Sequence, residues 1–295
     1  MSRRGWIPGT PRTISSLVDY VKLINEVNQH SALQERSFYY RGHEDESWPI
    51  KPSLARPDVN QELKKTYATD DLVTLQTLLV ERLRRLSEHH LPSVQVTGIP
   101  LDYLSWLTVA QHHNLPTFLL DFSLNPLVAL YFACCDEYSP KTRRSTDGCV
   151  WIMDVVPKAD RRGMRLGTIL HLEAMQMKSA LGVEAKLERE KERDTYLAIE
   201  ENGRLHYPVL VVPRLTTRRL ESQAGRFIYW VSEGPLEAYH AVNRKKPWRV
   251  LEKLCIIPQG AKGDVLKELL NFRIHPGTMR ADLDGYADFL RWGKL

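Results

Sequence analysis

One stretch of the chain, residues 117–135, constrains the fold more than any other. It begins with the apolar run Phe118–Phe122, continues through Ser-Leu-Asn-Pro, and ends in a second apolar run. Asn125 can cap a helix, and Pro126 can occupy the first helical position, where the missing N–H of proline is not needed. The stretch therefore predicts a short apolar strand followed by a helix with a well-defined start.

The other segments mix helical and extended patterns without a regular order. Apolar residues recur at the spacing of one helical face from Ile14 to Asn28, with Ser16 as a plausible cap. Helices are also predicted at 70–86, 101–111, 262–270 and 286–292, and strands at 37–41, 148–156, 207–213, 226–231 and 253–258. Because the strands do not alternate regularly with helices, we predict an α+β domain with a mixed or mainly antiparallel sheet core and surrounding helices.

Composition and charge set broad limits on function. Of 295 residues, 43% are hydrophobic and 26% are charged, which is typical of a folded globular chain with a large core. The length allows one large domain or two. Lys and Arg outnumber Asp and Glu by 41 to 36, an excess that permits an anionic partner without requiring one.

The four cysteines show no CxxC spacing and no accompanying pair of histidines, so neither a zinc site nor a disulfide framework is predicted. The basic N-terminus leads into an amphipathic stretch rather than the apolar core of a signal peptide. The longest apolar run, Leu127–Cys135, is about half of what a membrane span needs. We expect a soluble, cytoplasmic protein with no membrane partner.

The motifs of several common enzyme classes are missing from the sequence. It contains no GxGxxG after a strand, no P-loop, no HExxH and no GxSxG. What remains is a set of polar residues where predicted strands end, which is where sites are often built.

Arg41 is the first of these polar candidates. It follows three aromatic residues and precedes Gly42, so its guanidinium is expected at a strand end where the glycine lets a ligand approach the backbone. This suits a phosphate or pyrophosphate. The alternative is a structural ion pair with an acidic residue of the loop at 43–47.

Candidate site residues also occur at three further places in the sequence. His112 and His113 point different ways at a helix end, so at most one faces a site, and a hydrogen-bonded core role is the alternative. Asp121 lies in an apolar context and needs a partner, for which Arg41 is a candidate across the fold. The amide of Gln223 could bind a sugar hydroxyl, whereas Gly225 could simply serve a turn.

The segment FYYRGHEDESWPIKPSLAR resembles the signature of the FRG domain family, an aromatic-Arg-Gly followed by Pro-Ser-Leu and an arginine. Residues 110–133, DGCVWIMD, ESQAGRF and the tail HPGTMRADLDGYADFLRW are similar to further parts of that family. The resemblance covers roughly residues 36–295. Residues 1–35 would then be an N-terminal helical extension. The charge-rich pattern at about 161–205 predicts a helical insertion, which is either a solvated helix face or a mobile flap.

This sequence departs from the family pattern at four positions. The family often has glutamine where this chain has His43, glycine at Asn114, arginine at Phe118 and tryptophan at Phe122. If the Phe118 position normally supplies a cationic ligand contact, that contact is lost or relocated here. The family is found mainly in bacteria and their phages, and its name implies no single activity.

The order of the candidates also resembles the three-part layout of ADP-ribosyltransferases. That resemblance implies NAD bent in a cleft between two small sheets. Under it, Arg41 binds the pyrophosphate, His43 or His112 positions the ribose, and Glu221 or Gln223 stabilises the reacting sugar. The other residues expected to bind NAD are Gly42, Ser53, Thr117, Asp121 and Gly225.

Two classes of function follow from these resemblances. The first is a NAD-consuming effector similar to ADP-ribosyltransferases, such as a toxin or phage-defence component with an antitoxin or defence-system partner. Its acceptor would be a protein or a nucleic acid docked on residues 81–85 and Arg214, Arg218 and Arg219. The second is a non-catalytic module that senses a nucleotide or phosphate ligand. A metal-dependent phosphoryl transfer through Asp121 and His112 is less favoured, because no second carboxylate lies at a dependable spacing.

Overall fold

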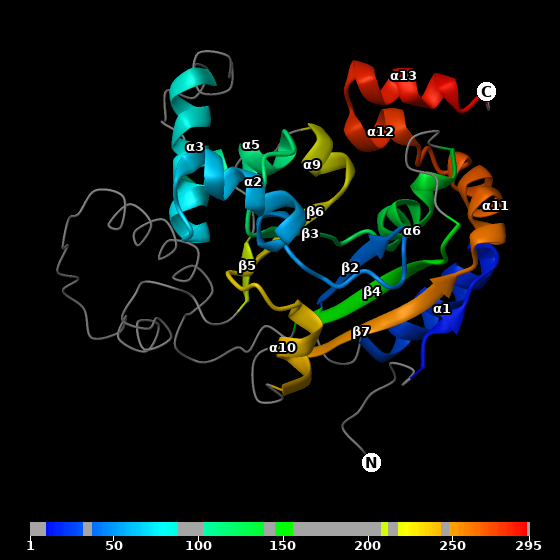
Figure 1. The fold of residues 1–295 in the computed structure, drawn as a ribbon. Coiled ribbons are helices and arrows are strands. Elements are labelled where there is room, and N and C mark those ends of the chain that lie inside the picture. The colour runs from blue at the N-terminus through cyan, green and yellow to red at the C-terminus, as the bar shows by residue number, and fades with distance from the viewer. Residues whose placement is uncertain are drawn as a thin grey trace.

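The computed structural model of the chain describes residues 10–31, 37–87, 103–138, 145–155, 208–211, 218–242 and 248–293 (Figure 1). Within these residues, seven strands form one mixed sheet in the order β1-β7-β4-β2-β3-β6-β5. The strands are β1 (Arg12–Thr13), β2 (Ser37–His43), β3 (Leu119–Ser123), β4 (Gly148–Val155), β5 (Val209–Val211), β6 (Gly225–Tyr229) and β7 (Trp248–Ile257). β1 runs parallel to β7 and every other pairing is antiparallel, which confirms the predicted α+β class.

The helices gather mainly on one face of this sheet. They are α1 (Leu17–Ser31), α2 (Pro57–Tyr67), α3 (Leu72–Ser87), α5 (Tyr103–His112), α6 (Pro126–Cys134), α9 (Arg218–Ser222), α10 (Leu236–Val242), α11 (Gln259–Leu270), α12 (Pro276–Arg280) and α13 (Leu283–Arg291). The buried side chains of α1, α6 and α11 pack on β2, β4 and β7, and those of α3 and α5 pack on β3, β5 and β6. A third apolar cluster on the opposite face includes Leu236 at the start of α10.

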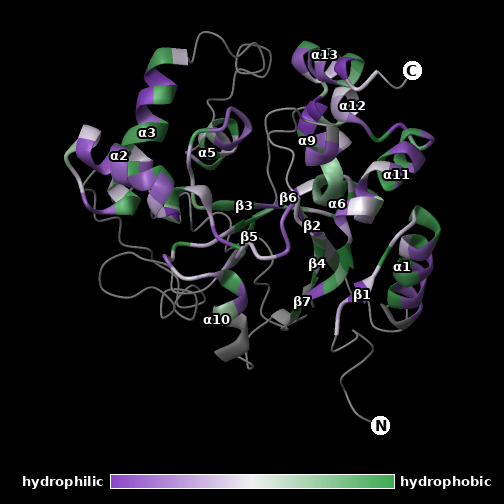
Figure 2. Cartoon of the chain, turned by 45° about the vertical axis from the view of Figure 1, so that its right-hand side comes forward, coloured by the Kyte–Doolittle hydropathy of each residue, from purple (hydrophilic) through white to green (hydrophobic). Residues whose placement is uncertain are grey.

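Hydropathy explains why the outer helices form. Figure 2 shows hydrophilic and hydrophobic residues interspersed along α1 and α3, as expected for helices that cover a sheet with one face. In α1 the buried residues include Tyr20, Leu23 and Val27. Among the described helices, none is both long and apolar enough to cross a bilayer.

Local sequence signals place several helix starts as predicted. Asn125 accepts a hydrogen bond from the backbone N–H of Leu127 at 2.9 Å, and Pro126 opens α6. Ser16 Oγ accepts from the N–H of Asp19 at 3.2 Å in front of α1. The charged insertion expected at about 161–205 lies outside the described residues.

The strand expected to end near Arg41 is longer than predicted. β2 continues to His43, because Gly42 and His43 pair with Val150 and Cys149 of β4. Arg41 therefore lies within the strand rather than emerging at its end. The extra length comes from pairing with β4, which lies about a hundred residues further along the chain. The local sequence pattern does not predict such long-range pairing.

The sheet is divided at the junction of β2 and β3. β2 pairs with β4 along its whole length, and β3 pairs with β6 along its whole length. β2 and β3, in contrast, pair with each other only at Tyr40 and Ser123. The β1-β7-β4-β2 and β3-β6-β5 halves therefore separate beyond this pair, and the backbone groups along the split need other partners.

Candidate functional site

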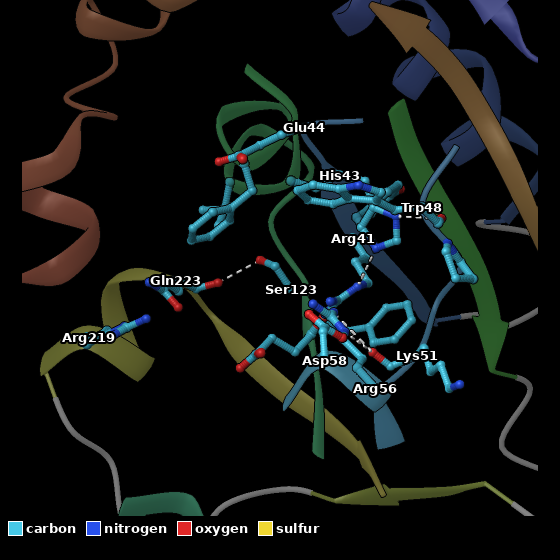
Figure 3. A pocket seen from close by; sticks show the side chains of 18 of the residues that line it. Arg41, His43, Glu44, Trp48, Lys51, Arg56, Asp58, Ser123, Arg219 and Gln223 are labelled. Atoms are coloured by element: carbon cyan, nitrogen blue, oxygen red, sulfur yellow. Dashed lines mark hydrogen bonds between the residues drawn. The ribbon is translucent and has the colours of Figure 1, made fainter. Parts of the chain in front are cut away.

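A pocket of about 710 Å³ lies at this split (Figure 3). Its size falls within the range of small-molecule sites, roughly 300–1,000 Å³. Its lining comes from both faces of β2, from the loop between β2 and α2, from the start of α2, and from β3, α6 and α9 with the turn after it. The charged and amide-bearing lining residues are Arg41, Glu44, Lys51, Arg56, Asp58, Asp121, Arg219 and Gln223.

Arg41 is held from two sides by uncharged acceptors. Side chains alternate along a strand, so Arg41 and His43 share a face of β2. Arg41 donates through Nε to Nε2 of His43 at 2.9 Å and through Nη1 to the main-chain oxygen of Asp121 across the split. A guanidinium has five N–H groups, so three remain that can reach a ligand.

His43 is neutral in this arrangement. Its Nε2 accepts from Arg41, so its proton belongs on Nδ1, which lies 3.2 Å from the main-chain oxygen of Trp48 and donates to it. Burial and the charge of Arg41 together lower the pKa of His43 to about 3. Both ring nitrogens are engaged, so this geometry makes His43 a support for Arg41.

Three more cations line the pocket beside Arg41, and they are Lys51, Arg56 and Arg219. Arg56 donates through Nε and Nη2 to the main-chain oxygen of Lys51 at 3.3 and 3.1 Å. Burial lowers the pKa of Arg41 most, the charge of Asp121 raises it, and the charge of Arg56 lowers it further. The charges of Asp121 and Arg56 thus act on the Arg41 guanidinium in opposite directions.

The carboxylate of Asp121 does not pair with Arg41 as predicted. It is exposed and accepts from Gln111 Nε2 at 2.7 Å, and Gln111 Oε1 accepts from Thr117 Oγ1 at 2.6 Å. Arg41 instead uses the main-chain oxygen of Asp121. The alternation along β3 gives the reason, because it turns the Asp121 side chain toward α5, where Gln111 lies.

Gln223 joins the pocket to the C-terminal helices. Ser123 Oγ donates to its main-chain oxygen at 2.6 Å, and its own Nε2 donates to the main-chain oxygen of Met279 in α12 at 2.8 Å. The amide oxygen of Gln223 remains as an acceptor for a ligand. The turn into β6 then passes through Ala224 in the left-handed region, with φ at 45°.

Residues 36–142 match the family model of the FRG domain, a range that contains β2, β3, α6 and the loop that carries Lys51 and Arg56. This part of the chain, residues 36–142, is an FRG domain. Comparison with curated proteins gives no match, and comparison with solved structures gives none.

Gly42 of the FRG domain serves helix packing in this structure. A Cβ at this position would lie 2.0 Å from the main-chain oxygen of Ala129 and 2.6 Å from the nitrogen of Ala133. Both atoms belong to the backbone of α6, which cannot move aside cheaply. The close approach that the glycine allows is therefore that of α6 to β2, beside the pocket that Gly42 also lines.

The three departures from the FRG pattern other than His43 also have a structural setting. Asn114 has φ at 61°, in the left-handed region that glycine favours and asparagine tolerates. Phe118 is buried edge-on against Tyr229, outside the pocket lining. Phe122 lines the pocket, with its ring centroid 6.0 Å from the guanidinium carbon of Arg41.

Several expected site residues lie outside the FRG pocket lining, namely Ser53, Thr117, His112, Glu221 and Gly225. Ser53 Oγ accepts from the Thr117 N–H at 3.2 Å, which is a structural bond between loops. The main-chain oxygen of His112 accepts from Arg219 Nη1 at 3.1 Å, and burial with the charge of Arg219 lowers the pKa of His112 to about 4. Glu221 is exposed on α9.

Sequence reasoning missed four charged lining residues, Glu44, Lys51, Arg56 and Asp58. The signal was present, because Lys51 and Arg56 flank the Pro-Ser-Leu of the FRG signature. Acceptor docking was expected on residues 81–85 and on Arg214, Arg218 and Arg219. In the structure, Arg84 pairs with Glu81 at 2.8 Å and Arg219 lines the pocket. Arg214 is outside the described residues. No cluster of three or more metal-ligating side chains occurs in the described part of the chain.

Proposed function

We propose that this pocket of the FRG domain binds a phosphate-bearing nucleotide. The observation that carries the proposal is the setting of Arg41, whose guanidinium is held by His43 Nε2 and a main-chain oxygen and keeps three N–H groups for a ligand. Arg56 lines the same pocket, and its charge repels that of Arg41. A phosphate between them would remove this repulsion and accept charge-assisted hydrogen bonds.

The other cations and the volume favour a ligand larger than a single phosphate. Lys51 and Arg219 add two positive charges to the lining, and about 710 Å³ suits a nucleotide or dinucleotide. A pyrophosphate on Arg41 and Arg56 would leave the amide oxygen of Gln223 to accept from a sugar hydroxyl. NAD has all of these parts and is the ligand that the resemblance to ADP-ribosyltransferases implies.

A second candidate is turnover of NAD by ADP-ribosyl transfer. It is favoured by the placement of Arg41, from an early strand, and Gln223, from a late element, in one pocket at a division of the sheet. In this reaction the bond from C1′ of the ribose to the nicotinamide nitrogen breaks, and its electron pair leaves with nicotinamide. Water or an acceptor nucleophile then bonds to C1′ and loses a proton, while nearby dipoles stabilise the ribosyl cation. A role as a toxin or phage-defence component that modifies protein or nucleic acid would follow from this activity.

The experiment is a calorimetric titration with NAD, paired with chromatography of the mixture for free nicotinamide. Wild type and the control R85A, which changes an exposed arginine on α3, are expected to bind NAD. R41A is expected to bind at least about tenfold more weakly, since each lost charge-assisted bond costs about 1.5–3 kcal/mol. Nicotinamide release would identify turnover of NAD, and binding without release would identify a sensor. No saturable binding to wild type, or equal affinity in R41A, would contradict the proposal.

A further inference from the structure

Helix α6 lines the pocket with apolar side chains. Its pocket residues are Phe132 together with Val128 and Ala129, which lie four and three residues earlier and therefore on the same face of the helix. Val128 and Ala129 are buried, at 1% exposure each, whereas Phe132 is half-buried. Phe132 is thus the side chain through which α6 offers apolar surface to a ligand.

The position of Phe132 is fixed by the packing of α6 on β2. A Cβ added to Gly42 would lie 2.9 Å from the carbonyl carbon of Phe132, so the helix backbone at Phe132 lies against the residue that follows Arg41. The ring itself meets the ring of the buried Tyr131 in a T-shaped arrangement, with the centroids 5.2 Å apart. A ring that is positioned before the ligand binds loses little freedom on binding.

Phe132 and Arg41 reach this pocket from opposite faces of β2. Side chains alternate along a strand, so the position of Gly42 faces α6 while the side chain of Arg41 leaves the other face. Both Phe132 and Arg41 line the pocket, because β2 and β3 separate beyond Tyr40 and leave an open edge in the described part of the sheet. A ligand at this edge can place a phosphate on Arg41 and a planar apolar group on Phe132. A nucleotide has both parts.

The other aromatic side chains of the lining have different settings. Tyr40 and Phe122 are buried, at 3% exposure each, so they offer little surface to a base. The main-chain oxygen of Trp48 accepts from His43, and the two ring centroids lie 6.3 Å apart. Trp48 therefore belongs to the group that supports His43, and Phe132 is the better placed ring for a base.

We propose that Phe132 binds the base of the nucleotide by stacking, so that the pocket selects nucleotides over sugar phosphates and free pyrophosphate. The proposal rests on the nucleotide binding proposed above. Stacking removes the apolar surface of both rings from water, and it tolerates any base because every base has a π-face. Phe132 therefore responds to the presence of a base rather than to its identity.

The first test compares AMP with ribose 5-phosphate by calorimetric titration of wild type. Both ligands carry the ribose and the phosphate, so the difference in affinity measures the contribution of the base. Wild type is expected to bind AMP at least about fivefold more tightly, which is the lower end of what stacking of one base contributes. Equal affinity for the two ligands would overturn the proposal.

The second test assigns this contribution to Phe132. F132L and F132M both remove the ring and keep an apolar side chain, and F272L is the matched control, because Phe272 is 58% exposed and outside the pocket lining. F132L and F132M are expected to reduce the preference for AMP below about twofold and to bind pyrophosphate within about threefold of wild type. F272L is expected to match wild type with all three ligands. Wild-type binding of pyrophosphate also shows that the pocket of a variant is folded.

The outcomes separate the two proposals. If F132L or F132M keeps the full preference for AMP, the base stacks elsewhere, for example on Trp48, and the role of Phe132 is overturned while nucleotide binding stands. If wild type binds none of AMP, ribose 5-phosphate and pyrophosphate, nucleotide binding fails, and the role of Phe132 fails with it.

Discussion

Arg41 and His43 lie two residues apart on one face of β2, and the guanidinium donates to the imidazole Nε2 at 2.9 Å. This bond requires a neutral imidazole, because a protonated ring has no acceptor. Burial and the charge of Arg41 lower the pKa of His43 to about 3, which keeps the ring neutral under physiological conditions. The orientation of the main pocket cation therefore depends on a histidine that does not titrate near neutral pH.

Substitution of His43 tests this dependence. H43Q is expected to bind NAD within about threefold of wild type, because a glutamine oxygen can accept from Arg41 Nε. H43L is expected to bind at least about tenfold more weakly, because it leaves a guanidinium N–H without an acceptor and frees the side chain to turn. The dissociation constants come from calorimetric titration. Wild-type affinity in H43L would show that His43 does not orient Arg41.

The same pKa shift predicts a pH dependence of stability. An unfolded histidine titrates near pH 6.5, whereas His43 in the fold has a pKa of about 3. Between these values the unfolded state binds the proton and the folded state does not, so stability falls as the pH falls. From pH 7 to pH 5 the loss from His43 is about 2 kcal/mol. Urea unfolding at both pH values should show a smaller loss for H43Q than for wild type, and equal losses would contradict the assignment.

Substitution of Gly42 tests the close packing of α6 on β2, and Gly260 provides a control position in the same chain. G42A places a Cβ 2.0 Å from the α6 backbone and is expected to lower the free energy of unfolding by at least about 3 kcal/mol. At Gly260, in the first turn of α11, nothing lies within 4 Å of an added Cβ. G260A is therefore expected to be neutral or to stabilise by up to about 1 kcal/mol. Thermal and urea unfolding measure both, and a G42A variant as stable as wild type would refute the contact.

The buried Lys262–Asp136 pair can be compared with an exposed pair on the same helix. K262M removes the ammonium that pairs with the buried Asp136 carboxylate, which is expected to cost about 3–5 kcal/mol. K267M breaks the exposed pair with Asp264 and is expected to cost less than about 0.5 kcal/mol. Urea unfolding of the two variants is the measurement. Similar losses in both would show that burial of the pair does not matter.

The parts of the fold that sequence predicts well depend on local chemistry. The start of α6 follows from the Asn125 side chain and the ring of Pro126, both within the first turn of the helix. The end of β2 was misplaced because His43 belongs to the strand only through its pairing with Cys149. The length of β2 is therefore decided by its pairing with β4 in the sheet and not by the local sequence.

The site shows the same division between local and long-range information. Arg41 and Gln223 stood out by residue type and spacing, and they line one pocket. The partner predicted for Asp121 was wrong, because strand alternation and the position of Gln111 decide where its carboxylate points. Arg56 was missed because a loop carries it, and only the tertiary fold brings it to the pocket that Arg41 lines.

The most direct test of the phosphate-binding claim compares ADP with adenosine by calorimetric titration of wild type and R41A. The two ligands differ only in the diphosphate, so their affinity difference measures what the pocket cations contribute. Wild type is expected to bind ADP at least about tenfold more tightly than adenosine, and R41A is expected to lose most of this difference. Equal affinity of wild type for both ligands, or an undiminished preference for ADP in R41A, would contradict the account.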